Sequence, residues 1–530
     1  MDTTLRDGEQ TSGVSFLPSE KLQIAKLLLD ELKIDRIEVA SARVSEGEME
    51  GVKRITQWAS EKGYLDRVEV LGFVDTPDSI NWIREAGGKV LNLLTKGSLN
   101  HLTHQLRKTP EQHFKDIEKS VIYARQNGIS VNVYLEDWSN GMRNSMDYTM
   151  DLIGELVQLQ VRRIMLPDTL GLLNPREVSH FLKLITSEYP DTHFDFHAHN
   201  DYDLSVANVL EAIYNGVGGI HTTVNGLGER AGNAPLESVI AVLKDFTDFK
   251  LNVKENKIYR VSKLVEQFSG QHIPANKPVV GENVFTQTAG IHADGDNKKN
   301  LYFNDLLPER FGRQRKYALG KTSGKANIVK NLQELGISLE PEELVKVTQR
   351  IIELGDKKER VTTEDLPYII SDVLQNNSIS HDIFIEGYNL SHSKGLRPTV
   401  QLKMNIYGDC YEEGASGDGQ YDAFMKALKK IYKSLNKELP VLTNYSVTIP
   451  PGGKTDAFVE TVITWDFGRI FKTKGLDSDQ TVAALKATEK MLNIIEKISK
   501  KDSGHEGGTE ENPEPDKKNF YGNEYSAIAG

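Results

Sequence analysis

Short apolar runs alternate with longer amphipathic stretches over the first 235 residues of the chain. Apolar residues recur at helical spacing from Ser19 to Lys33, and Pro110–Asn127 also predicts a helix. Near-continuous apolar strands that alternate with helices are typical of a parallel sheet covered by helices. The strands that this pattern predicts are Arg36–Ala40, Arg67–Phe73, Lys89–Leu94, Ser130–Glu136, Arg163–Thr169, His193–Asn200 and Gly219–Asn225.

Two architectures fit such a sheet, a doubly wound sheet and a (β/α)8 TIM barrel. A doubly wound sheet would place a glycine-rich phosphate loop after its first strand, and the sequence has none there. Polar residues instead recur at the C-terminal ends of successive strands, as the active-site mouth of a barrel requires. We therefore predict an α/β fold of the (β/α)8 TIM-barrel class.

The pattern supplies seven strands, whereas a barrel of this class needs eight. The missing strand is expected before Asp2, because the polar segment Asp2–Gln10 needs a strand to hold it and only Met1 precedes it. Either Met1 is an internal methionine of a longer chain, which we favour, or the barrel is incomplete. Mass spectrometry of the native N-terminus distinguishes the two.

The pattern becomes helical and polar after Glu237, and from Ile383 onward strands and helices alternate as in a separate α+β domain. We expect a barrel over residues 1–265, a helical linker over 266–380, an α+β C-terminal domain over 381–498 and a disordered tail over 499–530. The segment Phe285–Gly295 is expected to be irregular. The predicted helices are Asn252–Gly270, Pro341–Leu354, Glu364–Leu374, Tyr421–Leu435 and Asp479–Ile495, and the predicted strands are Thr399–Tyr407, Tyr445–Ile449 and Ala457–Trp465.

Composition narrows the choice of partners. A net charge of -12 over 530 residues argues against nucleic acid, whose phosphates this surface would repel. The longest apolar run, Ile24–Leu29, is far shorter than the roughly 20 residues of a membrane span. The single cysteine, Cys410, excludes an internal disulfide and fits a reducing compartment such as the cytoplasm. Small molecules are therefore the expected partners.

A barrel brings the ends of distant strands together at one mouth. Two histidines at positions i and i+2 of a strand, such as His197 and His199, project to the same face and can hold one cation. With Asp7 and Asn233 they would form a set of two nitrogen and two oxygen ligands, suited to Mn²⁺, Mg²⁺, Co²⁺ or Zn²⁺. The residues expected to share this mouth are Asp7, Glu136, Asp168, Thr169, His197, His199 and Asn233.

These segments resemble the metal-dependent aldol and Claisen enzymes that have a (β/α)8 barrel, and within them the 2-isopropylmalate, homocitrate and citramalate synthases. The resemblance runs from residue 2 to about residue 495. It implies a condensation of acetyl-CoA with a 2-oxo acid, on a divalent metal ion that chelates the oxo acid. The motifs that carry it are Asp2–Gln10, Leu166–Gly171, Phe196–Asn200, Asn225–Asn233 and Thr288–Asp294.

The resemblance also implies roles for single residues. Arg6 would neutralise the developing alkoxide or enolate. Glu136 and His292 are the candidates for removing a proton from the acetyl methyl group and for activating the hydrolytic water, and either could be the base. Thr169 would bind the carboxylate of the oxo acid. The residues that would seat acetyl-CoA are Asp294, Asn300 and Tyr302.

Substrate choice depends on the walls beside the oxo acid. Tyr134 stands two positions before Glu136, where isopropylmalate synthases typically have a small residue, and Leu71 and Leu94 add apolar bulk. Bulky walls favour the methyl group of pyruvate over the isopropyl group of 2-oxoisovalerate, as in spirochaete-type (R)-citramalate synthases. Citramalate synthase, in isoleucine biosynthesis, is therefore expected ahead of 2-isopropylmalate synthase, in leucine biosynthesis.

The C-terminal domain resembles the regulatory domain of these synthases, which binds an end-product amino acid between two subunits. A homodimer inhibited by isoleucine, or by leucine in the alternative case, is implied. A lyase of the same barrel family would need a catalytic cysteine in a mobile loop, and Cys410 lies in the wrong region. A paralogue that only binds would be expected to have lost Arg6, Asp7, Glu136 or a histidine ligand, and all of these are present.

Overall fold

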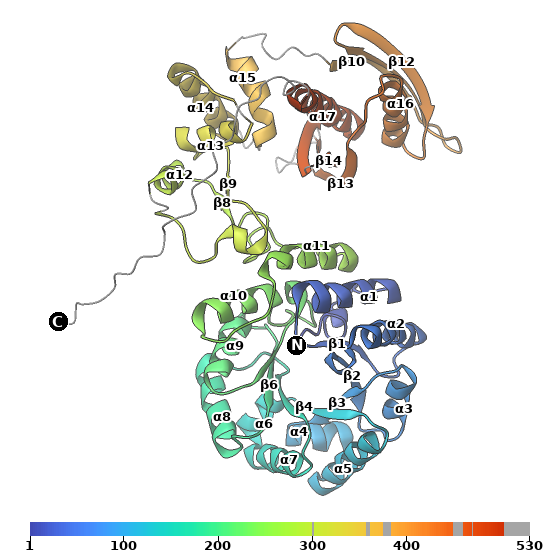
Figure 1. Cartoon of the computed structure of the whole chain (residues 1–530), viewed down its shortest axis with the longest axis vertical. Coiled ribbons are helices and arrows are strands. Elements are labelled where there is room, and N and C mark those ends of the chain that lie inside the picture. Colours follow the sequence, from blue (N-terminus) through green and yellow to red (C-terminus); the bar gives the residue numbers. More distant parts are fainter. Residues whose placement is uncertain are drawn as a thin grey trace, which may run out of the picture. The chain divides into compact units, whose positions relative to one another are not determined.

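The computed structural model describes residues 1–298, 301–335, 337–356, 361–374, 383–448, 459–468 and 470–502. The chain forms two compact units, Met1–Ala318 and Leu319–Gly530 (Figure 1). Over the described ranges, every helix is too short or too polar to cross a bilayer.

A curled parallel sheet of seven strands forms the centre of the first unit, and the strands are hydrogen-bonded in their sequence order. All seven lie where the apolar runs predict them. The last is shorter than expected, because regular pairing ends at His221, and Thr222 and Thr223 form only isolated bridges. The chain then turns at Val224–Gly226, where Asn225 has a φ of 59°. The strands are β1 (Ile37–Ser41), β2 (Val68–Phe73), β3 (Val90–Lys96), β4 (Ser130–Glu136), β5 (Arg163–Asp168), β6 (Phe194–Ala198) and β7 (Gly219–His221).

The first residues of the chain lie between β7 and β1 and close the ring of strands. Asp2 forms parallel bridges to both Ile37 and Thr222. The Asp2 amide donates to the carbonyl of Arg36 at 2.9 Å, and the Thr3 amide donates to that of Thr222 at 2.8 Å. This segment therefore occupies the place where the eighth strand is expected, while the upstream start stays a prediction.

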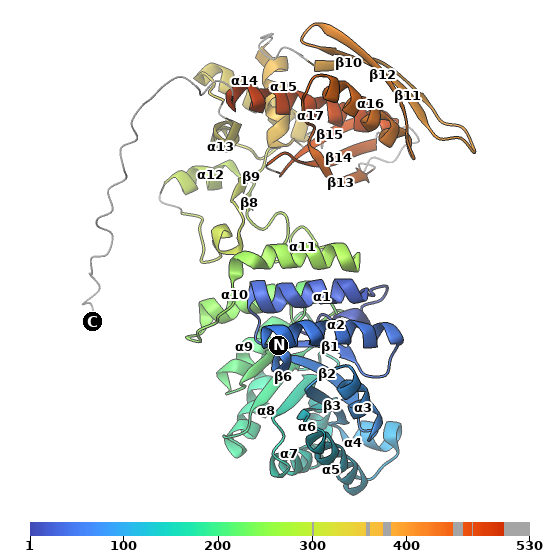
Figure 2. The ribbon, with the colours of Figure 1, turned by 45° about the vertical axis from the view of Figure 1, so that its right-hand side comes forward.

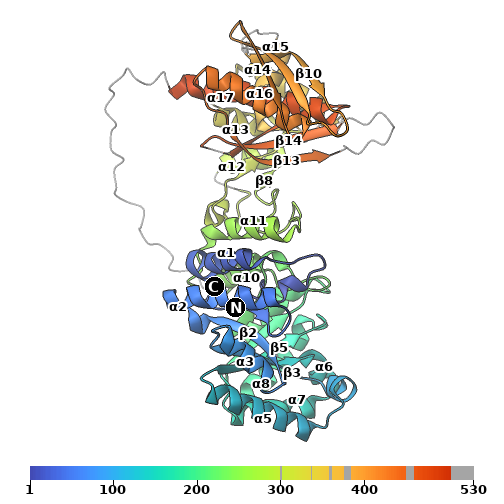
Figure 3. The ribbon, with the colours of Figure 1, turned by 90° about the vertical axis from the view of Figure 1, so that its right-hand side faces the viewer.

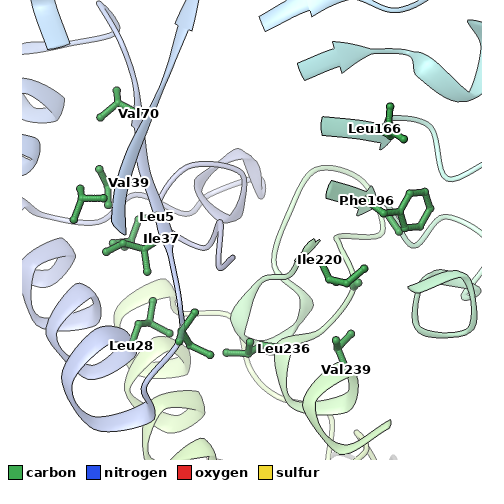
Figure 4. Close-up of a cluster of buried hydrophobic side chains, with 14 of the residues drawn as sticks. Leu5, Leu28, Ile37, Val39, Val70, Leu166, Phe196, Ile220, Leu236 and Val239 are labelled. Atoms are coloured by element: carbon green, nitrogen blue, oxygen red, sulfur yellow. The ribbon is translucent and has the colours of Figure 1, made fainter. Parts of the chain in front are cut away.

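Helices surround the strands on the outside of the ring (Figures 1 and 2). The space between the two layers is filled by buried apolar side chains, among them Leu28, Ile37, Leu166 and Leu236 (Figure 4). This arrangement confirms the predicted barrel class. The helices are α1 (Pro18–Lys26), a π-helical turn (Leu27–Leu32), α2 (Glu46–Lys62), α3 (Asp78–Glu85), α4 (Leu99–His101), α5 (Pro110–Gln126), α6 (Trp138–Asn144), α7 (Met146–Gln158), α8 (Pro175–Glu188), α9 (Ser205–Tyr214), α10 (Leu236–Phe246) and α11 (Ile258–Ser269).

The segment predicted to be irregular contains regular structure, so that expectation is wrong. Strand β8 (Thr286–Gln287) pairs in parallel with β9 (Lys316–Tyr317), and helix α12 (Gly290–Asn297) follows β8. The two glycines of this helix weaken its sequence signal. Gly295 nevertheless has a packing role, because a Cβ there would lie 2.4 Å from the ring of Tyr302.

The second unit begins with three helices that share a small apolar core, α13 (Lys325–Leu335), α14 (Pro341–Asp356) and α15 (Leu366–Leu374). Two antiparallel sheets of three strands follow, and each is covered by one helix (Figure 3). Apolar residues of both sheets and both helices form one common core, which confirms the α+β class of this region. The elements are β10 (Ile383–Ser391), β11 (Thr399–Ile406), β12 (Asp409–Ser416) and α16 (Gln420–Ser434), then β13 (Val441–Thr448), β14 (Val459–Asp466), β15 (Ile470–Asp477) and α17 (Gln480–Asp502).

Candidate active site

A tight turn after the first residues presents Arg6 and Asp7 to the barrel mouth. The amides of Arg6 and Asp7 donate to the carbonyl of Thr3 at 3.1 and 2.8 Å. The Asp2 carboxylate accepts from the Thr4 amide at 3.0 Å and from the Thr4 hydroxyl at 3.1 Å, which fixes the start of the turn. The turn therefore holds two adjacent charged side chains in a defined place.

The structure brings Asp7 together with the two histidines at the end of β6. Asp7 Oδ2 lies 3.2 Å from His197 Nε2 and 3.9 Å from His199 Nε2. One possible ligand atom of each residue lies within 4.8 Å of those of the other two. All three side chains are buried, so the cluster is the kind of site that holds a cation.

Asn233 also reaches this cluster, through a backbone bridge with His199. Its Nδ2 donates to the carbonyl of Leu227 at 3.1 Å, so its Oδ1 is turned away from that contact. The close packing depends on Gly228, where a Cβ would lie 2.2 Å from Asn233 Nδ2.

A divalent ion fits the chemistry of these four residues. Each has a buried polar atom without a hydrogen-bond partner: Oδ1 of Asp7, Nδ1 of His197, Nδ1 of His199 and Oδ1 of Asn233. Buried polar atoms are normally satisfied, so an unsatisfied atom on each of these four neighbouring residues fits a site that a ligand completes. The set of donors, two imidazoles, one carboxylate and one amide oxygen, matches the set that the sequence predicts.

The protonation states in the cluster suit a metal ion. Burial by itself would raise the pKa of Asp7, but the Arg6 guanidinium and the two histidines hold that pKa well below its usual range. Burial lowers the pKa of His199 to about 4, although Asp7 opposes the shift. Asp7 is thus a carboxylate and His199 a neutral imidazole at neutral pH, which are the forms that bind a cation.

Arg6 is held from three directions beside the cluster. Its guanidinium lies 2.6 Å from Glu38 Oε2, 3.0 Å from Asp7 Oδ2 and 3.3 Å from the Tyr134 hydroxyl. Glu38 is fully buried on β1, and no motif in the sequence marks it as a site residue. A fixed guanidinium with an edge toward the cluster can stabilise an oxyanion that develops there.

Glu136 lies at the C-terminal end of β4 and forms an ion pair with Lys96, at the end of β3. Its side chain is 24% exposed, so the carboxylate is accessible from the mouth. Thr169 is nearby in the fold, because its hydroxyl accepts from the amide of Asp137 at 2.9 Å. Asp168 instead accepts from the amides of Leu172 and Leu173, each at 2.9 Å, so it stabilises a turn.

The three predicted walls of the substrate pocket lie together. Leu71 and Tyr134 are buried in one small apolar cluster with Met165, and Leu94 packs against it. The Tyr134 ring meets the His197 ring edge-on, with centroids 6.1 Å apart. The cluster therefore lies next to the candidate metal ligands.

The predicted acetyl-CoA residues lie on and after α12. The rings of His292 and Tyr302 are 4.2 Å apart, and Asp294 pairs with Lys298 at 2.7 Å. Asn300 lies outside the described residues. Over the parts of the chain that are described, no hydrogen bond joins His292 or Tyr302 to the side chains of the metal cluster, so their roles stay predictions.

Three family models match consecutive parts of the chain. The HMGL-like model matches residues 1–265, the homocitrate synthase post-HMGL domain-like model matches 279–359, and the LeuA allosteric (dimerisation) domain model matches 360–496. The first of these covers the barrel with Asp7, His197 and His199. The protein is therefore an HMGL-like barrel protein with an allosteric domain.

Individual relatives narrow this class. The (R)-citramalate synthase of Methanocaldococcus jannaschii is 34% identical over 498 residues, which are 93% of this chain and 98% of the relative. The 2-isopropylmalate synthase of the same organism is 34% identical over 502 residues, 93% of this chain and 94% of the relative. The chain belongs to the family of the citramalate and 2-isopropylmalate synthases, which are metal-dependent enzymes that condense acetyl-CoA, and the predicted resemblance is confirmed.

Proposed function

We propose that this protein condenses acetyl-CoA with pyruvate to form (R)-citramalate, in isoleucine biosynthesis. The observation that carries the proposal is the buried group of Asp7, His197 and His199 with the Arg6 guanidinium fixed against it. A cation site next to a fixed positive charge suits a substrate that carries a carboxylate and a ketone, as 2-oxo acids do. Relatives named (R)-citramalate synthase and 2-isopropylmalate synthase support the same reaction class.

Asp7, His197, His199 and Asn233 would hold the divalent ion, which is Mn²⁺, Mg²⁺, Co²⁺ or Zn²⁺. When bound, such an ion polarises the ketone of the oxo acid and keeps its carboxylate in place. The oxygen ligands from Asp7 and Asn233 allow Mn²⁺ and Mg²⁺ as well as the two metals that prefer nitrogen. Metal analysis of the purified enzyme distinguishes them.

The remaining residues handle protons and negative charge. A base removes one proton from the acetyl methyl group, the methyl carbon bonds to the keto carbon, and the keto oxygen gains the proton. Arg6 stabilises the negative charge on that oxygen, and Thr169 binds the carboxylate of the oxo acid. Water then breaks the thioester, which releases CoA as a free thiol.

Glu136 and His292 are the two candidates for the base and for the group that activates water. Glu136 stands at the mouth of the barrel and forms an ion pair with Lys96. Asp294, Asn300 and Tyr302 would contact acetyl-CoA from the segment around α12. Deuterium exchange from acetyl-CoA into solvent, compared between Glu136→Gln and His292→Asn, identifies the base as the residue whose loss stops exchange.

Pyruvate is preferred in this proposal because Leu71, Leu94 and Tyr134 fill the space beside the site. 2-Oxoisovalerate carries two more methyl groups than pyruvate, and excluding each from a filled apolar pocket is worth about 1 to 3 kcal/mol in discrimination. The test is to compare kcat/KM for pyruvate and for 2-oxoisovalerate by release of CoA thiol. A clear preference for 2-oxoisovalerate would favour the second candidate, 2-isopropylmalate synthase. A relative with that name, 34% identical over 93% of this chain, supports this second candidate.

The C-terminal unit would make the enzyme a homodimer that responds to its end product. The match to the LeuA allosteric (dimerisation) domain supports this assignment. Isoleucine is the expected inhibitor for a citramalate synthase, and leucine for an isopropylmalate synthase. The two amino acids are therefore a second, independent test of the substrate.

A further inference from the structure

Behind Arg6, a row of buried polar side chains runs down the interior of the barrel. The Tyr134 hydroxyl lies 3.0 Å from Nδ1 of His221, and Nε2 of His221 lies 3.0 Å from Oδ2 of Asp195. His221 ends β7 and Asp195 is on β6, so three strands meet in this row. Tyr134, His221 and Asp195 are each at most 2% exposed.

The partners of these groups fix the direction of each hydrogen bond. Asp195 faces the guanidinium of Arg36 at 2.6 Å, so its carboxylate oxygens accept hydrogen bonds. Nε2 of His221 therefore carries the proton, which leaves Nδ1 as an acceptor. The Tyr134 hydroxyl donates to Nδ1, and its oxygen is free to accept from Arg6.

We infer that His221 is a positioning residue that holds the Tyr134 hydroxyl, and that through Tyr134 it sets both the place of Arg6 and the room beside the 2-oxo acid. This inference rests on the proposed function. The Tyr134 ring is a wall of the predicted pocket, and its hydroxyl is the only part of the ring that makes hydrogen bonds. Without an acceptor at Nδ1, the hydroxyl would turn toward Glu38 Oε2, which is 3.4 Å away and already accepts from Arg6.

The side chains beside His221 are packed so closely that Asp195 cannot move. A Cβ on Gly219, two residues earlier on the same strand, would lie 1.9 Å from Asp195 Oδ1 and 3.0 Å from Arg36. Arg36 also pairs with Glu69 at 3.1 Å. Asp195 is therefore held in a single position, which gives His221 a single orientation in turn.

Two substitutions of His221 separate its two hydrogen bonds. In His221→Asn the side-chain oxygen stands near the place of Nδ1 and can accept from Tyr134. In His221→Gln the amide nitrogen stands near the place of Nε2 and can donate to Asp195, whereas the Tyr134 hydroxyl loses its acceptor. Both substitutions remove the same ring, so each is the control for the other.

The assay is kcat/KM for pyruvate, 2-oxobutyrate and 2-oxoisovalerate, by thiol release, with wild type, His221→Asn, His221→Gln and Tyr134→Phe. We expect His221→Gln to lower the preference for pyruvate over 2-oxoisovalerate by about tenfold, and His221→Asn to retain most of it. Combining His221→Gln with Tyr134→Phe should add little to Tyr134→Phe alone, because both remove the same bond. If His221→Gln does not fold, Tyr134→Phe must still reduce the preference.

The possible outcomes distinguish a failure of the role of His221 from a failure of the proposed function. Equal preference for pyruvate in wild type, His221→Asn and His221→Gln would overturn the role of His221, as would additive losses in the double variant. A wild-type enzyme that releases no CoA with any 2-oxo acid would instead overturn the proposed function.

Discussion

A buried lysine ties the Arg6–Asp7 turn to the surrounding helices, and its replacement is the sharpest test of how the site is supported. Lys21, on α1, is 1% exposed. Its ammonium lies 2.5 Å from Glu9 Oε2 and 2.6 Å from Glu48 Oε1. It also donates to the carbonyls of Leu5 at 3.2 Å and Val39 at 3.3 Å. One cation thus joins the turn, β1 and α2.

The change Lys21→Met keeps the length of the side chain and removes the charge. The side chains of Glu9 and Glu48 are 16% and 17% exposed, so both carboxylates would remain largely buried without a partner. Removing one partner of a buried ion pair costs about 3 to 5 kcal/mol. Because both carboxylates keep some contact with water, we expect a loss of about 3 kcal/mol, or roughly 4 to 5 °C in Tm for the unit Met1–Ala318.

The burial of Glu48 makes the stability of the same variant depend on pH, which gives a second test. Burial raises the pKa of Glu48, and Lys21 opposes that shift. Without Lys21 the pKa of Glu48 should rise further, so Lys21→Met should lose less stability at low pH, where the carboxylate is protonated. Adding Glu48→Gln to Lys21→Met should recover part of the loss at neutral pH.

The measurement is urea unfolding of the full chain, followed by circular dichroism. The matched control is Lys53→Met on α2, whose ion pair with Glu85 is 3.2 Å long with side chains 43% and 68% exposed. That change should cost at most about 0.5 kcal/mol. If Lys21→Met and Lys53→Met lose the same stability, the turn does not depend on the buried cation.

Four further predictions follow from the site and the domains. Asp7→Asn should weaken Mn²⁺ binding at least about 100-fold in a titration of the full chain, and unchanged affinity would contradict the ligand set. Glu136→Gln should lower kcat by about 10² to 10⁴ with little change in KM for pyruvate, as measured by thiol release. Burial lowers the pKa of His113 and of His199 to about 4, from 6.5. Between these values the unfolded state binds more protons, so the free energy of unfolding should fall as pH falls from 6.5 to about 4, and His113→Gln should flatten that slope. Removing the chain after residue 380 should abolish inhibition by the end-product amino acid, and inhibition that persists would contradict the allocation of that domain.

The strands could be predicted because buried parallel strands leave a strong signal. Each of the seven is a short apolar run between helices, and the ends of β4 and β5 match the prediction within one residue. The grouping of the candidate metal ligands was predictable for a related reason. Strand ends converge in a barrel, so Asp7, His197 and His199 had to approach one another once the barrel was assigned.

Other parts of the fold left weaker signals. Strand β10 is a partly exposed edge strand, so polar residues interrupt its apolar positions and weaken the pattern that would predict it. Helix α12 contains two glycines and is fixed by packing against Tyr302, which sequence alone does not indicate. The ion pair of Lys96 with Glu136 joins the ends of the neighbouring strands β3 and β4. It could not be predicted, because the pairing of the two residues is set by the register of these strands.

The interior of the barrel contains polar side chains that the apolar pattern of the strands does not predict. Bulky branched residues usually fill such a barrel, yet here each strand places a polar side chain among apolar neighbours. Arg6 donates a hydrogen bond to Glu38, which also accepts one from Asn92. Further hydrogen bonds between interior side chains lead from there to Tyr134, whose hydroxyl accepts from Arg6 and closes the network. A closed network in which every member is satisfied is rigid, so the place of Arg6 depends on all seven strands and not only on its own turn. The residues that the strands contribute are Glu38, Glu69, Asn92, Asn132, Arg163, Asp195 and His221.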